Sequence, residues 1–122
     1  IVDSDEISVE VLKTALENNE YTVLMAEDGS KALEMIEKSL PAVIISEIML
    51  PKTDGFMIRK ILLSKSNSKN IPFIILSNLK NEESVIRAAS LGIEIYIKKP
   101  FMPAEIVGIV KNKTKGERDY GR

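Results

Sequence analysis

The chain has 122 residues, of which 44% are hydrophobic and 29% are charged, with a formal net charge of −1. This size and composition are typical of one soluble globular domain, and the small charge gives no electrostatic reason to expect nucleic acid or a membrane surface as a partner. The absence of Cys and His excludes disulfides, thiolate metal sites and histidine acid–base chemistry. Without an apolar run near the roughly 20 residues of a membrane span, or a visible signal peptide, we expect a cytoplasmic protein.

Short apolar runs alternate along the chain with amphipathic stretches of helical spacing. In chain order, we expect a strand at 1–2, a helix from about 7 to 16, a strand at 21–26, a helix that starts at 28–30 and continues to about 36, a strand at 42–46, a helix from 55 to about 64, a strand at 72–76, a helix at 82–91, a strand at 93–97 and a last helix that starts at Pro103. The polar segment 116–122 is expected to be a tail or the start of a linker, so the predicted domain covers 1–115.

Strands that alternate with helices predict an α/β fold, a parallel sheet with helices on both faces. Such sheets bind ligands outside the carboxyl ends of their strands. The residues at these ends are the candidate site: Asp3, Ser4, Asp5, Glu47, Ser77, Asn78, Lys98, Lys99 and Pro100.

Glu47 is the most informative of these residues. It ends the apolar run 42–46 and precedes a loop that contains Pro51, Asp54 and Gly55. A carboxylate at the tip of a buried strand indicates a site, and the alternative is a solvated strand-end acid without a role. The hydroxyl of Ser46 is expected on the opposite face, because side chains alternate along a strand.

Six stretches occur in order along the chain: IVDSDE (1–6), AEDGSKAL (26–33), EIMLPKTDGF (47–56), IPFIILS (71–77), AASLG (88–92) and YIKKPF (96–101). Together they resemble the receiver domain of two-component response regulators over nearly the whole chain. The resemblance implies a flavodoxin-like, doubly wound, five-stranded parallel sheet of order 2-1-3-4-5. A working member of that family accepts a phosphoryl group from a histidine kinase on an aspartate at the third strand tip, with Mg²⁺ held beside it.

The match to the family's site is partial. Asp3 matches the first acid of the acidic pocket, while Ser4 stands where the second acid, a direct metal ligand, is expected. Glu47 stands in place of the phosphoacceptor aspartate. The residues that match the phosphate-facing and switch positions are Ser77, Tyr96 and Lys99. The longer side chain of Glu47 is expected to reach Lys99 and Ser77.

We therefore expect a non-enzymatic signalling module, a degenerate receiver that acts through protein–protein contacts. No metal site is expected; Asp3 alone is a weak candidate ligand, so any Mg²⁺ binding should be weak. The family's output face corresponds to 82–91, Tyr96 and 103–113. A histidine kinase or an effector domain is the candidate partner, and a homodimer stays open.

Two alternatives stay open. One is a receiver that is still phosphorylated, on Glu47 or Asp5, with weakened Mg²⁺ binding. The other is an enzyme or ligand-binding protein on the same fold. The absence of a Gly-x-Gly-x-x-Gly or Walker motif argues against a dinucleotide-binding enzyme.

Overall fold

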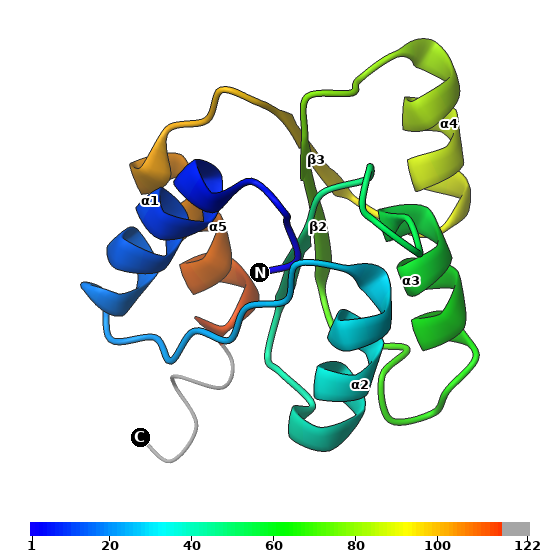
Figure 1. Ribbon diagram of the computed structural model, residues 1–122, viewed down its shortest axis with the longest axis horizontal. Helices are drawn as coiled ribbons and strands as arrows, with labels where there is room; N and C mark the ends of the chain where they lie inside the picture. Colours follow the sequence, from blue (N-terminus) through cyan, green and yellow to red (C-terminus); the bar gives the residue numbers. More distant parts are fainter. Residues whose placement is uncertain (116–122) are drawn as a thin grey trace.

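A parallel sheet lies between two layers of helices in the computed structural model of the protein, which describes residues 1–115 (Figure 1). Helices α1 and α5 cover one face of the sheet, and α2, α3 and α4 cover the other (Figure 1). The elements in chain order are α1 (Glu6–Glu17), α2 (Gly29–Ser39), β1 (Ile44–Ser46), α3 (Gly55–Leu63), β2 (Phe73–Ser77), α4 (Glu82–Ser90), β3 (Ile95–Lys98) and α5 (Pro103–Lys113). The layered α/β architecture agrees with the prediction. The predicted tail at 116–122 lies outside the described residues.

Within residues 1–115 the sheet has three strands in the order β1-β2-β3, all parallel. The prediction of five strands is not confirmed. Val2 forms isolated parallel bridges with Ala26 and with Ser46, so its backbone lies between those two segments. The predicted strand 21–26 forms a bridge only at Ala26.

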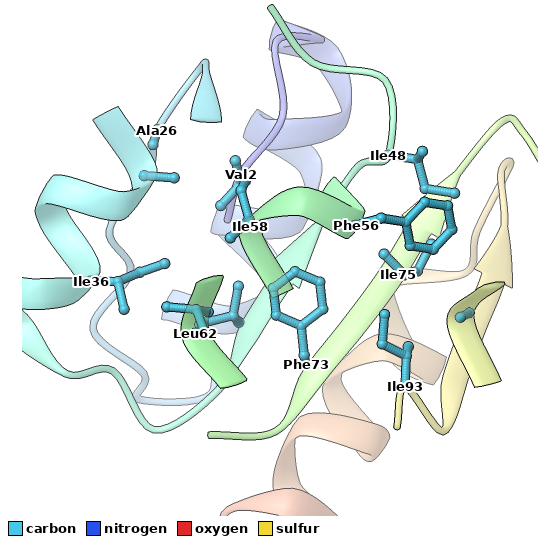
Figure 2. Packing of buried hydrophobic residues seen from close by; sticks show 13 residues of the cluster. Val2, Ala26, Ile36, Ile48, Phe56, Ile58, Leu62, Phe73, Ile75 and Ile93 are labelled. Carbon is cyan, nitrogen blue, oxygen red and sulfur yellow. The ribbon is translucent and has the colours of Figure 1, made fainter. Parts of the chain in front are cut away.

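Two hydrophobic clusters hold the layers together, one on each face of the sheet. Because successive strand residues point to opposite faces, Ile44 and Ile75 belong to one cluster, whereas Ile45 and Ile74 belong to the other. Figure 2 shows the cluster that faces α2, α3 and α4. Burial on both faces explains why the β1 and β2 sequences are continuously apolar before their final serines.

Four helices begin at Asp or Asn side chains that accept a hydrogen bond from a backbone N–H of the first turn. These caps are Asp5, Asp28, Asp54 and Asn81. Each cap lies at the end of a loop that leaves the sheet, and it fixes the residue at which the following helix begins. Among the described helices, none is long and apolar enough to cross a membrane.

Candidate functional site

The carboxyl ends of β1, β2 and β3 and the residues after Val2 meet at one edge of the sheet. Glu47 follows β1, Ser77 ends β2, and Lys99 follows β3. Asp3 joins them because its backbone is tied to Ala26, while Val2 is tied to Ile45 and Glu47. The structure thus brings together four of the residues that the sequence predicted.

Glu47 is buried, with 7% of its surface exposed, and both of its carboxylate oxygens have partners. Its Oε1 accepts a hydrogen bond from the backbone N–H of Ile48 at 2.7 Å and another from the hydroxyl of Ser77. Its Oε2 lies 3.2 Å from Nζ of Lys99. The predicted reach toward Lys99 and Ser77 is confirmed, and the alternative of a solvated strand-end acid is wrong.

Lys99 is the centre of an ion cluster. Its Nζ donates to Oδ2 of Asp3 at 2.7 Å, lies 3.2 Å from Glu47 and lies 4.0 Å from Oδ2 of Asp5. Burial by itself lowers the pKa of Lys99, but the hydrogen bonds and charges of Asp3 and Glu47 outweigh it and raise the pKa above the ordinary 10.5. The ammonium therefore stays charged at neutral pH.

The three residues after Val2, which are Asp3, Ser4 and Asp5, have different environments. Asp3 is buried, and its Oδ1 accepts the backbone N–H of Asp5 at 2.9 Å. Asp5 caps α1 by accepting from Ile7 N at 3.2 Å and from the Ser8 hydroxyl at 2.8 Å; this hydroxyl contact, more than any other, lowers the pKa of Asp5. Ser4 is exposed. Ser4, predicted for the acidic pocket, makes none of the described contacts of Lys99.

Tyr96 lies on β3 and is connected to the site through one intervening residue. The hydroxyl of Ser77, besides donating to Glu47, accepts the backbone N–H of Leu79 at 3.1 Å. The carbonyl of Leu79 in turn accepts a hydrogen bond from the Tyr96 hydroxyl, which also bonds Oγ of Ser84 at 2.8 Å. A continuous series of hydrogen bonds thus runs from Glu47 to the first turn of α4.

Two residues of this network, Ser84 and Lys80, were not predicted from the sequence. Ser84 forms a reciprocal capping box with Asn81, and the spacing Asn-x-x-Ser before a helix was a signal that could have indicated it. Lys80 contacts Tyr96 through its ammonium group, and no pattern in the sequence marks it. Ser46, by contrast, donates its hydroxyl to the carbonyl of Glu47 and is fully buried.

The described part of the chain contains no group of three or more Asp, Glu, His or Cys side chains arranged to hold a metal ion. In the acidic pocket, Asp3 and Glu47 direct carboxylate oxygens at Lys99 instead.

This α/β fold, with a lysine and acids at the strand tips, defines a receiver-type signalling domain. The model of the response regulator receiver domain family matches residues 1–111, and the chain belongs to that family. It is 34% identical over 111 residues to the alkaline phosphatase synthesis transcriptional regulatory protein PhoP of Bacillus subtilis, covering 91% of this chain and 45% of that protein. It is 32% identical over 120 residues to the response regulator SaeR of Staphylococcus aureus, covering 98% of this chain and 51% of SaeR.

Solved structures agree with the assignment. The receiver domain of the Francisella response regulator 1452 is 34% identical and superposes with a TM-score of 0.84, covering 95% of this chain and 94% of that one. The chain spans about half the length of the curated relatives that it matches.

Proposed function

We propose that this receiver domain is an atypical, non-enzymatic module of a two-component phosphorelay, in which Glu47 takes the place of the phosphoacceptor and the domain acts through protein–protein contacts. One observation carries the proposal: the carboxylate of Glu47 is already bound by the groups expected to hold a phosphoryl group, Ser77 and Lys99.

The arrangement leaves Glu47 poorly placed to act as a nucleophile. Phosphoryl transfer depends on in-line positioning and electrostatics, and misplacement by about 1 Å can cost roughly 10²-fold in rate. Oε1 accepts two hydrogen bonds and Oε2 faces the ammonium of Lys99, so each oxygen has its partners inside the protein. As a substitute for a phosphoryl group the carboxylate is incomplete, because it carries −1 rather than about −1.5 to −2.

The donor set does not fit Mg²⁺ in this arrangement. Mg²⁺ requires near-octahedral oxygen ligands and is usually held by one or two carboxylates. Here Asp3 and Glu47 already neutralise Lys99, and Ser4 supplies no charge. A divalent ion would have to displace the ammonium of Lys99 from both carboxylates. We therefore propose that Mg²⁺ binding is weak and that signalling does not require it.

The proposed output face consists of α4, Tyr96 and α5. Val85 and Ile86 on α4 are 41% and 61% exposed, which offers apolar surface to a partner. The greater length of PhoP and SaeR supports a partner domain within a longer protein, and the role of PhoP as a transcriptional regulatory protein supports an effector that controls transcription. The other partners that we propose are a histidine kinase and a second copy of the domain. We also propose that the domain acts in the cytoplasm and makes no direct contact with membrane or nucleic acid.

The test is phosphorylation with acetyl phosphate, or its imitation by beryllofluoride, in the presence of Mg²⁺. Intact mass and amide NMR spectra would be compared for the wild type, Glu47→Asp and the double variant Ser4→Asp/Glu47→Asp. We expect no covalent adduct and no Mg²⁺-dependent shift for the wild type, and recovery of both in the double variant. Sub-millimolar Mg²⁺ binding by the wild type at the strand tips would refute the proposal.

The alternative, a receiver that is still phosphorylated, has one observation in its favour: Asp5 is exposed, and its Oδ2 lies 4.0 Å from Nζ of Lys99. A phosphorylated wild-type protein would establish this alternative. Loss of the adduct in Asp5→Asn, but not in Glu47→Gln, would then identify Asp5 as the acceptor.

A further inference from the structure

Lys80, in the loop between β2 and α4, makes two contacts with Tyr96. Its Nζ donates a hydrogen bond to the backbone carbonyl of Tyr96 at 3.0 Å, and the same Nζ lies over the Tyr96 ring, 5.3 Å from the ring centroid. An ammonium group within about 6 Å of an aromatic face is attracted by the negative face of the ring. One side chain thus contacts both the backbone and the ring of Tyr96.

The charge of Lys80 is directed to Tyr96 rather than to a carboxylate. Glu82 and Glu83 follow it closely in the chain, yet within residues 1–115 no acidic oxygen lies within 4.0 Å of Nζ of Lys80. The side chain is exposed, and within residues 1–115 its ammonium contacts the backbone carbonyl and the ring of Tyr96.

The other contacts of Tyr96 hold the ring inward. The ring packs against the core cluster on the α2, α3 and α4 face of the sheet, and the hydroxyl bonds the carbonyl of Leu79 and Oγ of Ser84. Ser84 belongs to the capping box at the start of α4. An outward rotation of the ring would break these hydrogen bonds and would also remove the ring from beneath the ammonium of Lys80.

We propose that Lys80 is a positioning residue that clamps Tyr96 in the inward orientation and so sets the state of the output face from outside the Glu47 site. The inference rests on the proposed function for its regulatory meaning, but its contacts are separate from those of Glu47. The orientation of Tyr96 then depends on the charge of one exposed lysine as well as on the hydrogen bonds that lead from Glu47.

The test follows the Tyr96 ring by NMR in protein with ring-labelled tyrosine, with Tyr96→Phe used to assign its signals. Lys80→Met keeps most of the aliphatic stem and removes the charge, and we expect the ratio of inward to outward ring to fall about two- to fivefold, the factor that an exposed cation–π contact provides. Lys80→Arg keeps the cation and should restore the wild-type ratio.

Lys60→Met is the matched control, because Lys60 is exposed on α3 and makes none of the described contacts of Tyr96. It should leave the ring signals unchanged. Wild-type ring signals in Lys80→Met, equal changes in the control, or failure of Lys80→Arg to restore the ratio would each overturn the proposal.

Glu47→Gln separates this inference from the proposed function. If Lys80→Met moves the ring and Glu47→Gln does not, the clamp stands and the role of Glu47 as a phosphate substitute fails. If Glu47→Gln moves the ring and Lys80→Met does not, the clamp is refuted while the proposed function stands.

Discussion

Replacing Glu47 with Gln keeps the shape of the side chain and removes its charge, so it tests the ion cluster directly. The amide oxygen can still accept from Ile48 N and from Ser77, but the attraction to Lys99 at 3.2 Å is lost. A hydrogen bond to a charged group contributes about 1.5–3 kcal/mol, whereas removing the only partner of a buried ion costs about 3–5 kcal/mol. Lys99 keeps Asp3 at 2.7 Å, so the smaller range applies.

We expect Glu47→Gln to lower the free energy of unfolding by about 2 kcal/mol, and to lower Tm by about 6–10 °C for a domain of this size. The measurement is urea and thermal unfolding followed by circular dichroism at pH 7. Glu37→Gln is the matched control, because Glu37 is 71% exposed and lies 3.9 Å from Lys65. Its effect should stay within about 0.5 kcal/mol.

A change below about 0.5 kcal/mol in Glu47→Gln would refute this reasoning. A gain in stability would refute it as well, and would mean that the buried charge is retained at a cost to stability, as occurs for some buried ion pairs.

Lys99→Met leaves its carboxylate partners without a cation and should cost more than Glu47→Gln, at about 3–5 kcal/mol; the double variant should lose less than the sum of the two, and additive losses in urea unfolding would contradict a direct interaction. Burial lowers the pKa of Lys99 but its acidic partners raise it above 10.5 overall, so its stabilisation is complete below pH 10.5 and lost as the pH rises through the higher folded-state pKa. The difference in unfolding free energy between the wild type and Lys99→Met should be flat through neutral pH and shrink only above 10.5. Asn81→Ala removes the capping box of α4 and should cost about 1 kcal/mol, measurable as faster amide exchange in the first turn of that helix. Gly29→Ala places a Cβ 2.4 Å from the carbonyl oxygen of Thr53, so the loop before α3 must shift; we expect a loss of about 1–3 kcal/mol.

The elements that depend on local pattern could be predicted from the sequence. The buried runs that became β1 and β2 are continuously apolar, and four helices begin at Asp or Asn residues that are recognisable as caps. The site could be located because parallel strands end at one edge, which places Glu47, Ser77 and Lys99 side by side whatever the details of packing.

The remaining features depend on partners that are distant in sequence. The segment 21–26 has strand-like residues, yet its pairing depends on a segment distant in sequence, and the bridge that it forms is at Ala26 with Val2. Lys80 and Tyr96 are 16 residues apart in two different elements, and an exposed lysine in a loop has no pattern that predicts an aromatic partner. Asp5, by contrast, was predicted among the strand-end residues, and its Oδ2 lies 4.0 Å from Nζ of Lys99.

The ion cluster also gives the site a net charge. Three carboxylates, those of Asp3, Asp5 and Glu47, lie within 4.0 Å of the ammonium of Lys99, and together the four groups have a formal charge of −2. A phosphorylated histidine or a small acyl phosphate is itself an anion, and like charges repel it on approach unless a metal ion intervenes. The local charge of the cluster therefore opposes the approach of such an anionic phosphoryl donor as long as no metal ion is bound.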